Sequence, residues 1–186
     1  MTTVFISGSM QIKNIDKKVK DRIDNIISSG FDIVLGDASG VDSSIQDYLC
    51  KASYQNVTIF HSGDSLRNNL GHWKTHNTYS KYKPGTRAFF TAKDIEMASI
   101  ADYGLMVWDT KSTGTLCNAI EMLANKKKTV VFINKIKEFV EISNANDFEK
   151  LISYMSENVL VKADKKIGLK RKIESLKYKE NSLFPA

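Results

Sequence analysis

Acidic side chains occur at the points of the sequence where a parallel sheet would bind a ligand. Asp37 and Asp109 each directly follow an apolar run, and Asp94 opens a helical stretch. A carboxylate at such a position can bind a pair of ribose hydroxyls, or act as an acid, a base or a nucleophile. Helix capping is the alternative role for Asp94. For Asp42 we expect a role as a helix cap or as a first-turn acid, since such acids offset the helix dipole.

The segment Ser112–Thr115 has the composition of a phosphate-binding loop. Its sequence, Ser-Thr-Gly-Thr, joins an apolar run to an amphipathic helical pattern. Gly114 would let the backbone approach a ligand closely, and the free N–H groups of a helix N-terminus suit a phosphate. Thr113 and Thr115 could add hydroxyl donors. The alternative is that Ser112 or Thr113 only caps the helix.

Glycine and serine follow two further apolar runs, which suggests a shared crevice. Ligands of open α/β sheets bind beyond the carboxyl ends of the strands, so several strand ends should surround the same ligand. Besides Asp37 and Asp109, the candidate binding residues at these ends are Ser7, Gly8, Ser9, Gly36, Ser39 and Gly40.

The histidines give little support for a metal centre. His72 and His76 are four residues apart and would share one face of a helix, but no third ligand is placed near them. We therefore predict neither a metal site nor a cofactor. His61, at the end of an apolar run, is a candidate general base whose expected role is structural.

Apolar runs alternate with helical patterns up to residue 134. The expected strands are 3–7, 31–36, 56–60, 103–108 and 129–134. Continuous apolar strands that alternate with helices indicate a parallel sheet covered on both faces, and right-handed crossovers then give a Rossmann-like fold. We predict an α/β protein, a Rossmann-like three-layer sandwich with a five-stranded, mainly parallel sheet and additional C-terminal helices.

Helical spacing also predicts which side chains face the core. Residues 92–101 should form a helix with Ile95 and Ala98 facing inward, together with Ile100 or Ala101. Further helices are expected at 146–157 and 164–179. The two cysteines, Cys50 and Cys117, lie within apolar helical patterns, so we expect small core residues in a reducing cytosol.

The stretch 61–91 does not fit this alternation. It contains aromatic, amide and basic side chains without clear periodicity, and loops of this length are usually functional or disordered. Trp73 and Phe90 argue against disorder, so we expect a long inserted binding loop or lid. Arg67 and Arg87 within it are candidates to reach a phosphate.

Basic residues are concentrated near the C-terminus. The chain has a net charge of +6, and residues 162–180 hold eight lysines and arginines against three acids. The rest of the chain is nearly neutral, which disfavours nucleic acid as a partner because such binding depends on phosphate neutralisation. We expect a nucleotide-binding domain at 1–160 and a basic helical tail at 161–186 whose charged face is solvated.

Neither a secretion signal nor a membrane span is expected. The N-terminal segment lacks a basic leader and its apolar run is short. No stretch approaches the roughly 20 apolar residues of a transmembrane helix. These features predict a cytoplasmic protein without a membrane partner.

Four segments together resemble a known superfamily. "FISGS", "VLGDASGVD", "AKDIEMASIADYGLMVWD" and "KSTGT" are similar in order and position to the SLOG superfamily, over roughly residues 3–134. This Rossmann-like group contains the lonely-guy phosphoribohydrolases, the DNA-processing protein DprA and nucleotide-sensing domains of bacterial defence proteins. The sequence is also similar to the nucleoside 2-deoxyribosyltransferases. Within the group it most resembles the standalone members.

The resemblance implies a nucleotide or nucleotide-sugar site at the crevice. Enzymes of the group cleave N-glycosidic bonds and keep a Gly-Thr-rich phosphate loop, which Ser112 to Thr115 match here. They also keep an acid that opens the helix before the fourth strand, which Asp94 matches. Relatives often pair through helices that flank the sheet, so a homo-oligomer is expected.

The sequence departs from its relatives at two positions. They carry a glutamate in the first turn after the phosphate loop, where this chain has Asn118. An amide cannot form the ester intermediate, although Glu121 lies one turn further on and shares a helix face with it. Met10 stands where an arginine often reaches the phosphate in relatives, and Arg67 or Arg87 could replace that arginine.

Two functions follow from these features, and a third is weaker. The first is binding of a nucleotide, or of an NAD- or ADP-ribose-like ligand, by a sensor or sequestering module, which Asn118 and Met10 favour. The alternative is an N-glycosidase, a ribosyl hydrolase or transferase acting on nucleotides. Its catalytic carboxylates would be Asp94, Asp37, Asp109 and Glu121. The third is a nucleic-acid-binding protein.

Overall fold

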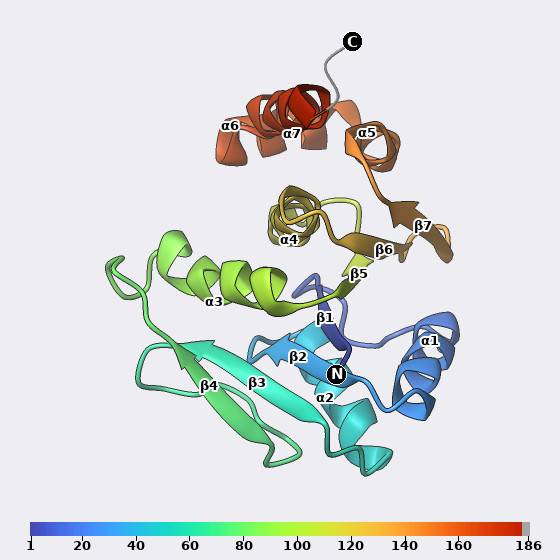
Figure 1. Cartoon of the computed structure of the whole chain (residues 1–186), viewed down its shortest axis with the longest axis vertical. Coiled ribbons are helices and arrows are strands. Elements are labelled where there is room, and N and C mark those ends of the chain that lie inside the picture. The colour runs from blue at the N-terminus through green and yellow to red at the C-terminus, as the bar shows by residue number, and fades with distance from the viewer. Residues whose placement is uncertain (184–186) are drawn as a thin grey trace.

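A seven-stranded sheet runs through the computed structural model, which describes residues 1–183 (Figure 1). The strands are β1 (Thr3–Gly8), β2 (Asp32–Gly36), β3 (Val57–Ser62), β4 (Lys74–Thr78), β5 (Tyr103–Trp108), β6 (Lys128–Ile133) and β7 (Glu138–Ile142). Their order is β4-β3-β2-β1-β5-β6-β7, with every neighbouring pair parallel except β6 and β7. The predicted α/β, Rossmann-like class is confirmed, whereas the predicted number of five strands is wrong.

The two strands missing from the prediction are the edge strands. β4 (KTHNT) and β7 (EFVEI) are largely exposed, and each buries only its last residue fully. An edge strand pairs on one side only and needs no continuous apolar run, so the hydrophobic pattern that marks buried strands is absent from both.

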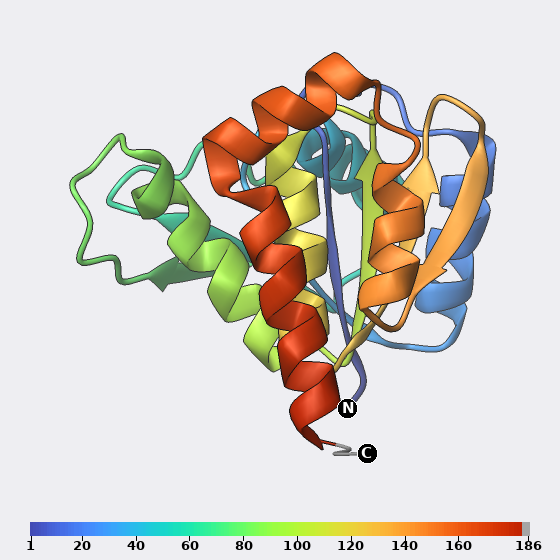
Figure 2. The ribbon, with the colours of Figure 1, turned by 90° about the horizontal axis from the view of Figure 1, so that it is seen from above.

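Helices cover both faces of the sheet. They are α1 (Lys17–Ser28), α2 (Val41–Lys51), α3 (Arg87–Ile100), α4 (Thr113–Ala124), α5 (Ala145–Ile152), α6 (Glu157–Ile167) and α7 (Leu169–Leu183). The first two pack on one face, and α3 and α4 pack on the other (Figure 1). α5 packs on β7, and α6 and α7 lie over α4 (Figure 2). None of the helices among residues 1–183 combines the length and apolar character that a membrane crossing requires.

The alternation of side chains along each strand creates two cores. In β1, Val4 and Ile6 face the core under α1 and α2, while Phe5 faces the core under α3 and α4. Successive side chains of a strand point to opposite faces, so an uninterrupted apolar strand serves both cores. This is why the central strands could be recognised from the sequence.

α3 begins earlier than predicted. Its N-cap is Thr86, whose hydroxyl oxygen accepts a hydrogen bond from the Phe89 N–H group. Its buried face contains Phe89, Lys93 and Met97 at intervals of four residues. Ile95, predicted to face inward, lies on the opposite face and is 49% exposed. The predicted helix began at residue 92 and lacked Phe89, so the spacing of Phe89, Lys93 and Met97 that defines the buried face could not be recognised.

Ala98 and Ala101 are buried as predicted, whereas Ile100 is exposed. The cysteine prediction was also wrong in part. Cys50 is exposed, and Cys117 is only partly buried.

The stretch 61–91 is not one long loop. It includes the end of β3, all of β4 and the first turn of α3. Its irregular parts are 63–73 and 79–86. The first is held in place by Trp73, whose indole N–H donates to the Tyr54 carbonyl. The Asn69 side chain accepts from the Trp73 N–H group and donates to the Trp73 carbonyl. Gln46, fully buried on α2, adds hydrogen bonds to the Asn68 carbonyl and the Leu70 N–H group.

The C-terminal segment forms part of the core. The predicted domain boundary at residue 160 falls inside α6, and the predicted helices 146–157 and 164–179 are instead α5, α6 and α7, with a left-handed Gly168 between the last two. Four side chains of α6 and α7 are buried in the core that α4 lines: Ala163, Leu169, Ile173 and Leu176.

Candidate functional site

A cavity of about 940 Å³ opens where the chain reverses its direction across the sheet. From β1 the strands proceed to β2, β3 and β4, and the chain then returns to β5 on the other side of β1. The carboxyl ends of β1 and β5 form the crevice in which such folds bind ligands. Of the residues predicted for the site, thirteen line the cavity: Ser7, Gly8, Ser9, Gly36, Arg67, Arg87, Asp94, Asp109, Ser112, Thr113, Gly114, Thr115 and Asn118.

The N-terminus of α4 faces this cavity. Ser112 is the N-cap, and its hydroxyl oxygen accepts from the N–H group and the hydroxyl of Thr115, at 3.5 and 3.2 Å. The N–H groups of Thr113 and Gly114 have no partner among residues 1–183. Capping and ligand binding are therefore compatible here, because the cap leaves two N–H groups free.

Among the predicted glycines, only Gly114 faces open space. A Cβ atom there would approach only the Ser112 hydroxyl oxygen, at 3.9 Å. A Cβ on Gly36 would lie 2.6 Å from both an Asp42 oxygen and the Lys93 ammonium nitrogen. At Gly8 and Gly40 it would meet neighbouring backbone at 2.4 Å. These three glycines therefore permit close packing within the protein, whereas Gly114 leaves its space to the cavity.

Asp109 organises the turn that precedes α4. Its Oδ1 atom accepts from the N–H groups of Lys111 and Ser112, at 2.9 and 2.6 Å. Its Oδ2 atom accepts from the hydroxyl of Ser9, at 2.7 Å. Both carboxylate oxygens are thus engaged in joining the end of β1 to the phosphate-loop segment.

Four cations line the cavity without a carboxylate partner among the side chains of residues 1–179, which are the ones that the structure describes: Arg87, Lys111, Lys162 and Lys166. Arg87 reaches the first turn of α4, where Nη1 donates to the Thr113 hydroxyl oxygen at 3.4 Å. The Thr113 side chain is 8% exposed, and its own hydroxyl proton has no acceptor in the described chain. Unpaired positive charge and free donors are therefore present together in the lining of this cavity.

Arg67 has a different environment from Arg87. It donates from Nη2 to the Asp37 Oδ1 atom, from Nε to Oδ2 at 3.0 Å, and from its backbone N–H to Oδ2 at 3.2 Å. Burial alone would raise the pKa of Asp37, but the hydrogen bonds from Arg67 outweigh it and the pKa is lowered. The same hydrogen bonds raise the pKa of Arg67. This pair anchors the 63–73 loop to the end of β2.

Lys93 is a buried cation of the cavity that the sequence analysis missed. It is 4% exposed, and its ammonium nitrogen lies 2.5 Å from the Asp94 Oδ1 atom. Burial would lower the pKa of Lys93, but the carboxylates of Asp94 and Asp42 outweigh this effect and raise it. The available signal was its place between Phe89 and Met97 on the apolar face of α3.

Asp42 lies beside Lys93 and also lines the cavity. Burial raises its pKa from 3.8 to about 7, against the lowering effect of the Lys93 ammonium group. Its carboxylate accepts a hydrogen bond from the Ala38 N–H group at 3.3 Å. Gly40 is the N-cap of α2 and provides no side-chain cap, so Asp42 lies in the first turn, as expected, but is not the cap.

Asn118, which stands where the predicted resemblance would place a glutamate, is 6% exposed and lines the cavity. Its amide nitrogen donates to the Ser7 hydroxyl oxygen at 2.9 Å, and that hydroxyl donates to the Met106 sulfur at 3.0 Å. The Asn118 carbonyl oxygen has no partner among residues 1–183. Glu121, the proposed substitute, does not line the cavity, and neither do Asp37, Ser39 and Gly40.

Part of the lining of the cavity is apolar. Met10, Phe90, Met97 and Val159 contribute to its lining. The Arg67 guanidinium carbon lies 5.1 Å from the centre of the Phe90 ring. Phe90 is 37% exposed, so its ring is available to a flat ligand group.

The histidines lie outside this cavity. His76 is on β4, and its Nε2 atom lies 2.8 Å from a Glu96 carboxylate oxygen, whereas His72 is in the preceding loop. Within residues 1–183 no group of three or more His, Cys, Asp or Glu side chains could hold a metal ion.

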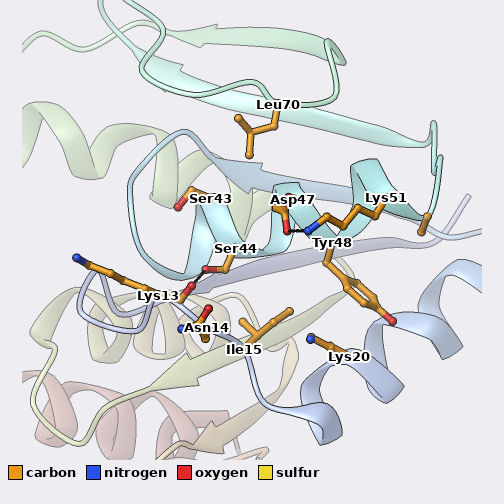
Figure 3. A pocket seen from close by; sticks show the side chains of 11 residues that line it. Lys13, Asn14, Ile15, Lys20, Ser43, Ser44, Asp47, Tyr48, Lys51 and Leu70 are labelled. Atoms are coloured by element: carbon orange, nitrogen blue, oxygen red, sulfur yellow. Dashed lines mark hydrogen bonds and ion pairs between the residues drawn. The ribbon is translucent and has the colours of Figure 1, made fainter.

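A second cavity, of about 670 Å³, lies between α2 and the segment before α1 (Figure 3). Two pairs of its polar groups bond to one another: the Lys51 ammonium group pairs with Asp47 at 2.6 Å, and the Ser44 hydroxyl donates to the Lys13 carbonyl. None of the predicted site residues lines it.

Comparison of the chain with protein-family models, curated proteins and solved structures finds no match. The cavity at the sheet edge and the four sequence segments described above are therefore the basis for assigning a function. The resemblance to the SLOG superfamily stays a prediction.

Proposed function

We propose that the protein binds a nucleotide, with a phosphate group at the N-terminus of α4. The observation that supports this proposal best is the gathering of unpaired cations around free N–H groups. Arg87 and Lys111 line the cavity beside the N–H groups of Thr113 and Gly114. A helix N-terminus supplies N–H donors and a partial positive charge, and the cations complete the neutralisation of a phosphate.

The remainder of the ligand would extend from α4 toward α3. The Asn118 carbonyl oxygen and the Asp94 carboxylate, which is 18% exposed, offer acceptors for sugar hydroxyls along this path. Phe90 and Met97 also line the cavity and would provide apolar contacts for a base. A phosphate, a sugar and a base thus each have chemically suitable neighbours in one cavity.

Binding without cleavage is the function that this site supports better than hydrolysis. N-glycoside cleavage of the family type needs a free carboxylate as nucleophile or as a stabiliser of the sugar cation. Asp37 and Asp109 are engaged by hydrogen bonds, Asp94 is paired with Lys93, and Glu121 lies off the cavity. Asn118 contributes an amide held by Ser7.

One observation favours the alternative, an N-glycosidase. Asp42 is a buried carboxyl group with a pKa of about 7 that lines the same cavity as Asp94. A carboxyl group with such a pKa is protonated in part at neutral pH and can donate its proton to a leaving base. This makes Asp42 the strongest candidate for a general acid if the ligand is cut.

A panel of nucleotides distinguishes the two functions. Nucleoside monophosphates, deoxynucleotides, NAD and ADP-ribose would be mixed with the protein, with the matching nucleosides as phosphate-free controls. A bound nucleotide at about 100 times its Kd should stabilise the fold by about 2.7 kcal/mol, measured by thermal unfolding. Chromatography of the same mixtures detects any released base.

The binding proposal expects stabilisation by nucleotides, none by nucleosides, and no released base. Arg87→Ala should weaken this stabilisation, whereas Lys83→Ala, which removes an equal charge from the exposed segment before α3, should not. Release of base that disappears in Asp42→Asn would establish the alternative. A panel without any effect would contradict both functions.

A further inference from the structure

α6 brings two lysines to the cavity from outside the sheet layer. The helix crosses the carboxyl edge of the sheet near the N-terminus of α4 (Figure 2). Lys162 and Lys166 are one turn apart, so they share one face of α6, and both line the cavity. Ala163, between them, is 1% exposed and packs into the core. The lysines are therefore carried by a docked helix.

These two lysines are distinct from the rest of the basic C-terminal segment. Lys165, Lys170, Arg171, Lys172 and Lys177 do not line the cavity. Lys177 forms an ion pair with Glu149 at 2.8 Å. Lys162 and Lys166 have no carboxylate partner among the described side chains, those of residues 1–179. A general solvated tail would not direct only these two residues to a cavity that Arg87 and Lys111 also line without a carboxylate partner.

One phosphate does not require this much positive charge. A phosphate monoester carries about −1.5 to −2 charges at pH 7. The N-terminus of α4 with Arg87 and Lys111 already supplies two full charges and the helix dipole. Lys162 and Lys166 add two more from a separate element, and ligand cavities usually range from about 300 to 1,000 Å³. At about 940 Å³ this cavity has room for a second anionic group.

We propose that Lys162 and Lys166 bind a second phosphate group, which makes a nucleotide with a diphosphate the preferred ligand. This inference rests on the proposed function, because the first phosphate is the one at α4. Two classes of ligand contain such a diphosphate. It can be terminal, as in a nucleoside diphosphate, or bridged to a second sugar, as in ADP-ribose.

The test is isothermal titration calorimetry on the full chain with matched pairs of nucleotides. AMP and ADP, and GMP and GDP, differ only in the second phosphate, while ADP-ribose distinguishes a bridged diphosphate from a terminal one. The variants are Lys162→Ala/Lys166→Ala and, as a control with the same loss of charge, Lys165→Ala/Lys170→Ala. All four lysines are exposed, so both variants should fold.

For the base that the protein binds, we expect the nucleoside diphosphate to bind at least about tenfold more tightly than the matching monophosphate. The Lys162→Ala/Lys166→Ala variant should lose this advantage and keep its monophosphate affinity within about threefold, and the control variant should keep both. ADP-ribose binding stronger than ADP binding would assign the bridged form, and the reverse would assign the terminal form.

Equal affinity for the two members of each pair would overturn the inference. So would a diphosphate advantage that survives Lys162→Ala/Lys166→Ala, or one that the control variant loses equally. In each of these cases nucleotides still bind, so the proposed function stands. If neither monophosphates nor diphosphates bind, the proposed function itself fails.

Discussion

The carboxyl group of Asp42 is buried between the Ala38 N–H group and the ammonium group of Lys93. A Cβ atom on Gly36 would collide with both charged groups, so the glycine is what lets them meet. Burial raises the pKa of Asp42 to about 7, and the carboxylates of Asp94 and Asp42 raise that of Lys93 despite burial. The proton on Asp42 is therefore gained and lost near neutral pH.

Replacement of Asp42 by asparagine should change how stability depends on pH. The pKa of Asp42 is raised from 3.8 to about 7 in the folded state. The folded protein therefore holds a proton that the unfolded chain releases between about pH 4 and pH 7. This stabilisation is complete below about pH 4 and is lost as the pH rises through 7. In that window the wild type should lose up to about 1.4 kcal/mol per pH unit relative to Asp42→Asn.

Urea unfolding at pH 5, 6, 7 and 8 measures this difference in the free energy of unfolding. Asp47→Asn, on the exposed side of the same helix, serves as the control. Parallel curves for the wild type and Asp42→Asn would show that the Asp42 carboxyl group keeps its ordinary pKa.

At the scale of elements, α4 combines a satisfied cap with an open first turn. Ser112 accepts from Thr115, while the N–H groups of Thr113 and Gly114 remain free. Asp109 holds the preceding turn, and Ser9 links it to β1. The turn before α4 is thus held by hydrogen bonds within the protein, which would lower the entropic cost of binding the proposed phosphate.

Gly114→Ala should separate stability from ligand affinity. The methyl group would meet no protein atom closer than 3.9 Å, and alanine stabilises a helix by up to about 1 kcal/mol relative to glycine. Stability should therefore be unchanged or slightly higher in urea unfolding. Nucleotide affinity should fall by about tenfold, because the methyl group occupies space that the phosphate needs. A variant that loses both stability and affinity would contradict an open first turn.

For the whole molecule, the C-terminal helices belong to the same folding unit as the sheet. Leu169, Ile173 and Leu176 share a core cluster with Met122 of α4 and Phe148 of α5. The domain boundary expected at residue 160 therefore does not separate two cores. The expected homo-oligomer and the cytoplasmic location stay predictions.

The variant Ile173→Ala tests whether α6 and α7 unfold together with the sheet. Ile173 is 6% exposed, and truncation of a buried isoleucine to alanine costs about 2–5 kcal/mol. Urea unfolding followed by tryptophan fluorescence and by circular dichroism should give one shared transition, shifted by this amount. Lys170→Ala, on the exposed face of α7, should change stability by less than about 0.5 kcal/mol. Separate transitions in the two signals would show that α6 and α7 unfold independently.

The sequence by itself determined the central strands and the Ser-Thr-Gly-Thr segment at which α4 begins. Buried strands such as β1 and β5 appear as continuous apolar runs because both of their faces are covered. A Ser-Thr-Gly-Thr turn between a strand and a helix is a local feature, so Ser112 and Gly114 could be identified without knowing what surrounds them. The carboxyl ends of parallel strands lie at the same edge of a sheet, so the parallel topology alone predicted that these segments meet there.

Only the tertiary structure decided which charges meet. Asp37 pairs with Arg67, thirty residues away, and Lys93 is buried against Asp42 through the space that a glycine leaves. Lys162 and Lys166 reach the cavity because α6 folds back over α4. Ion pairing depends on distance in space and on burial, and hydrophobic periodicity along the chain reports neither. The edge strands β4 and β7 could not be predicted from the hydrophobic pattern either, because they are stabilised by pairing with β3 and β6.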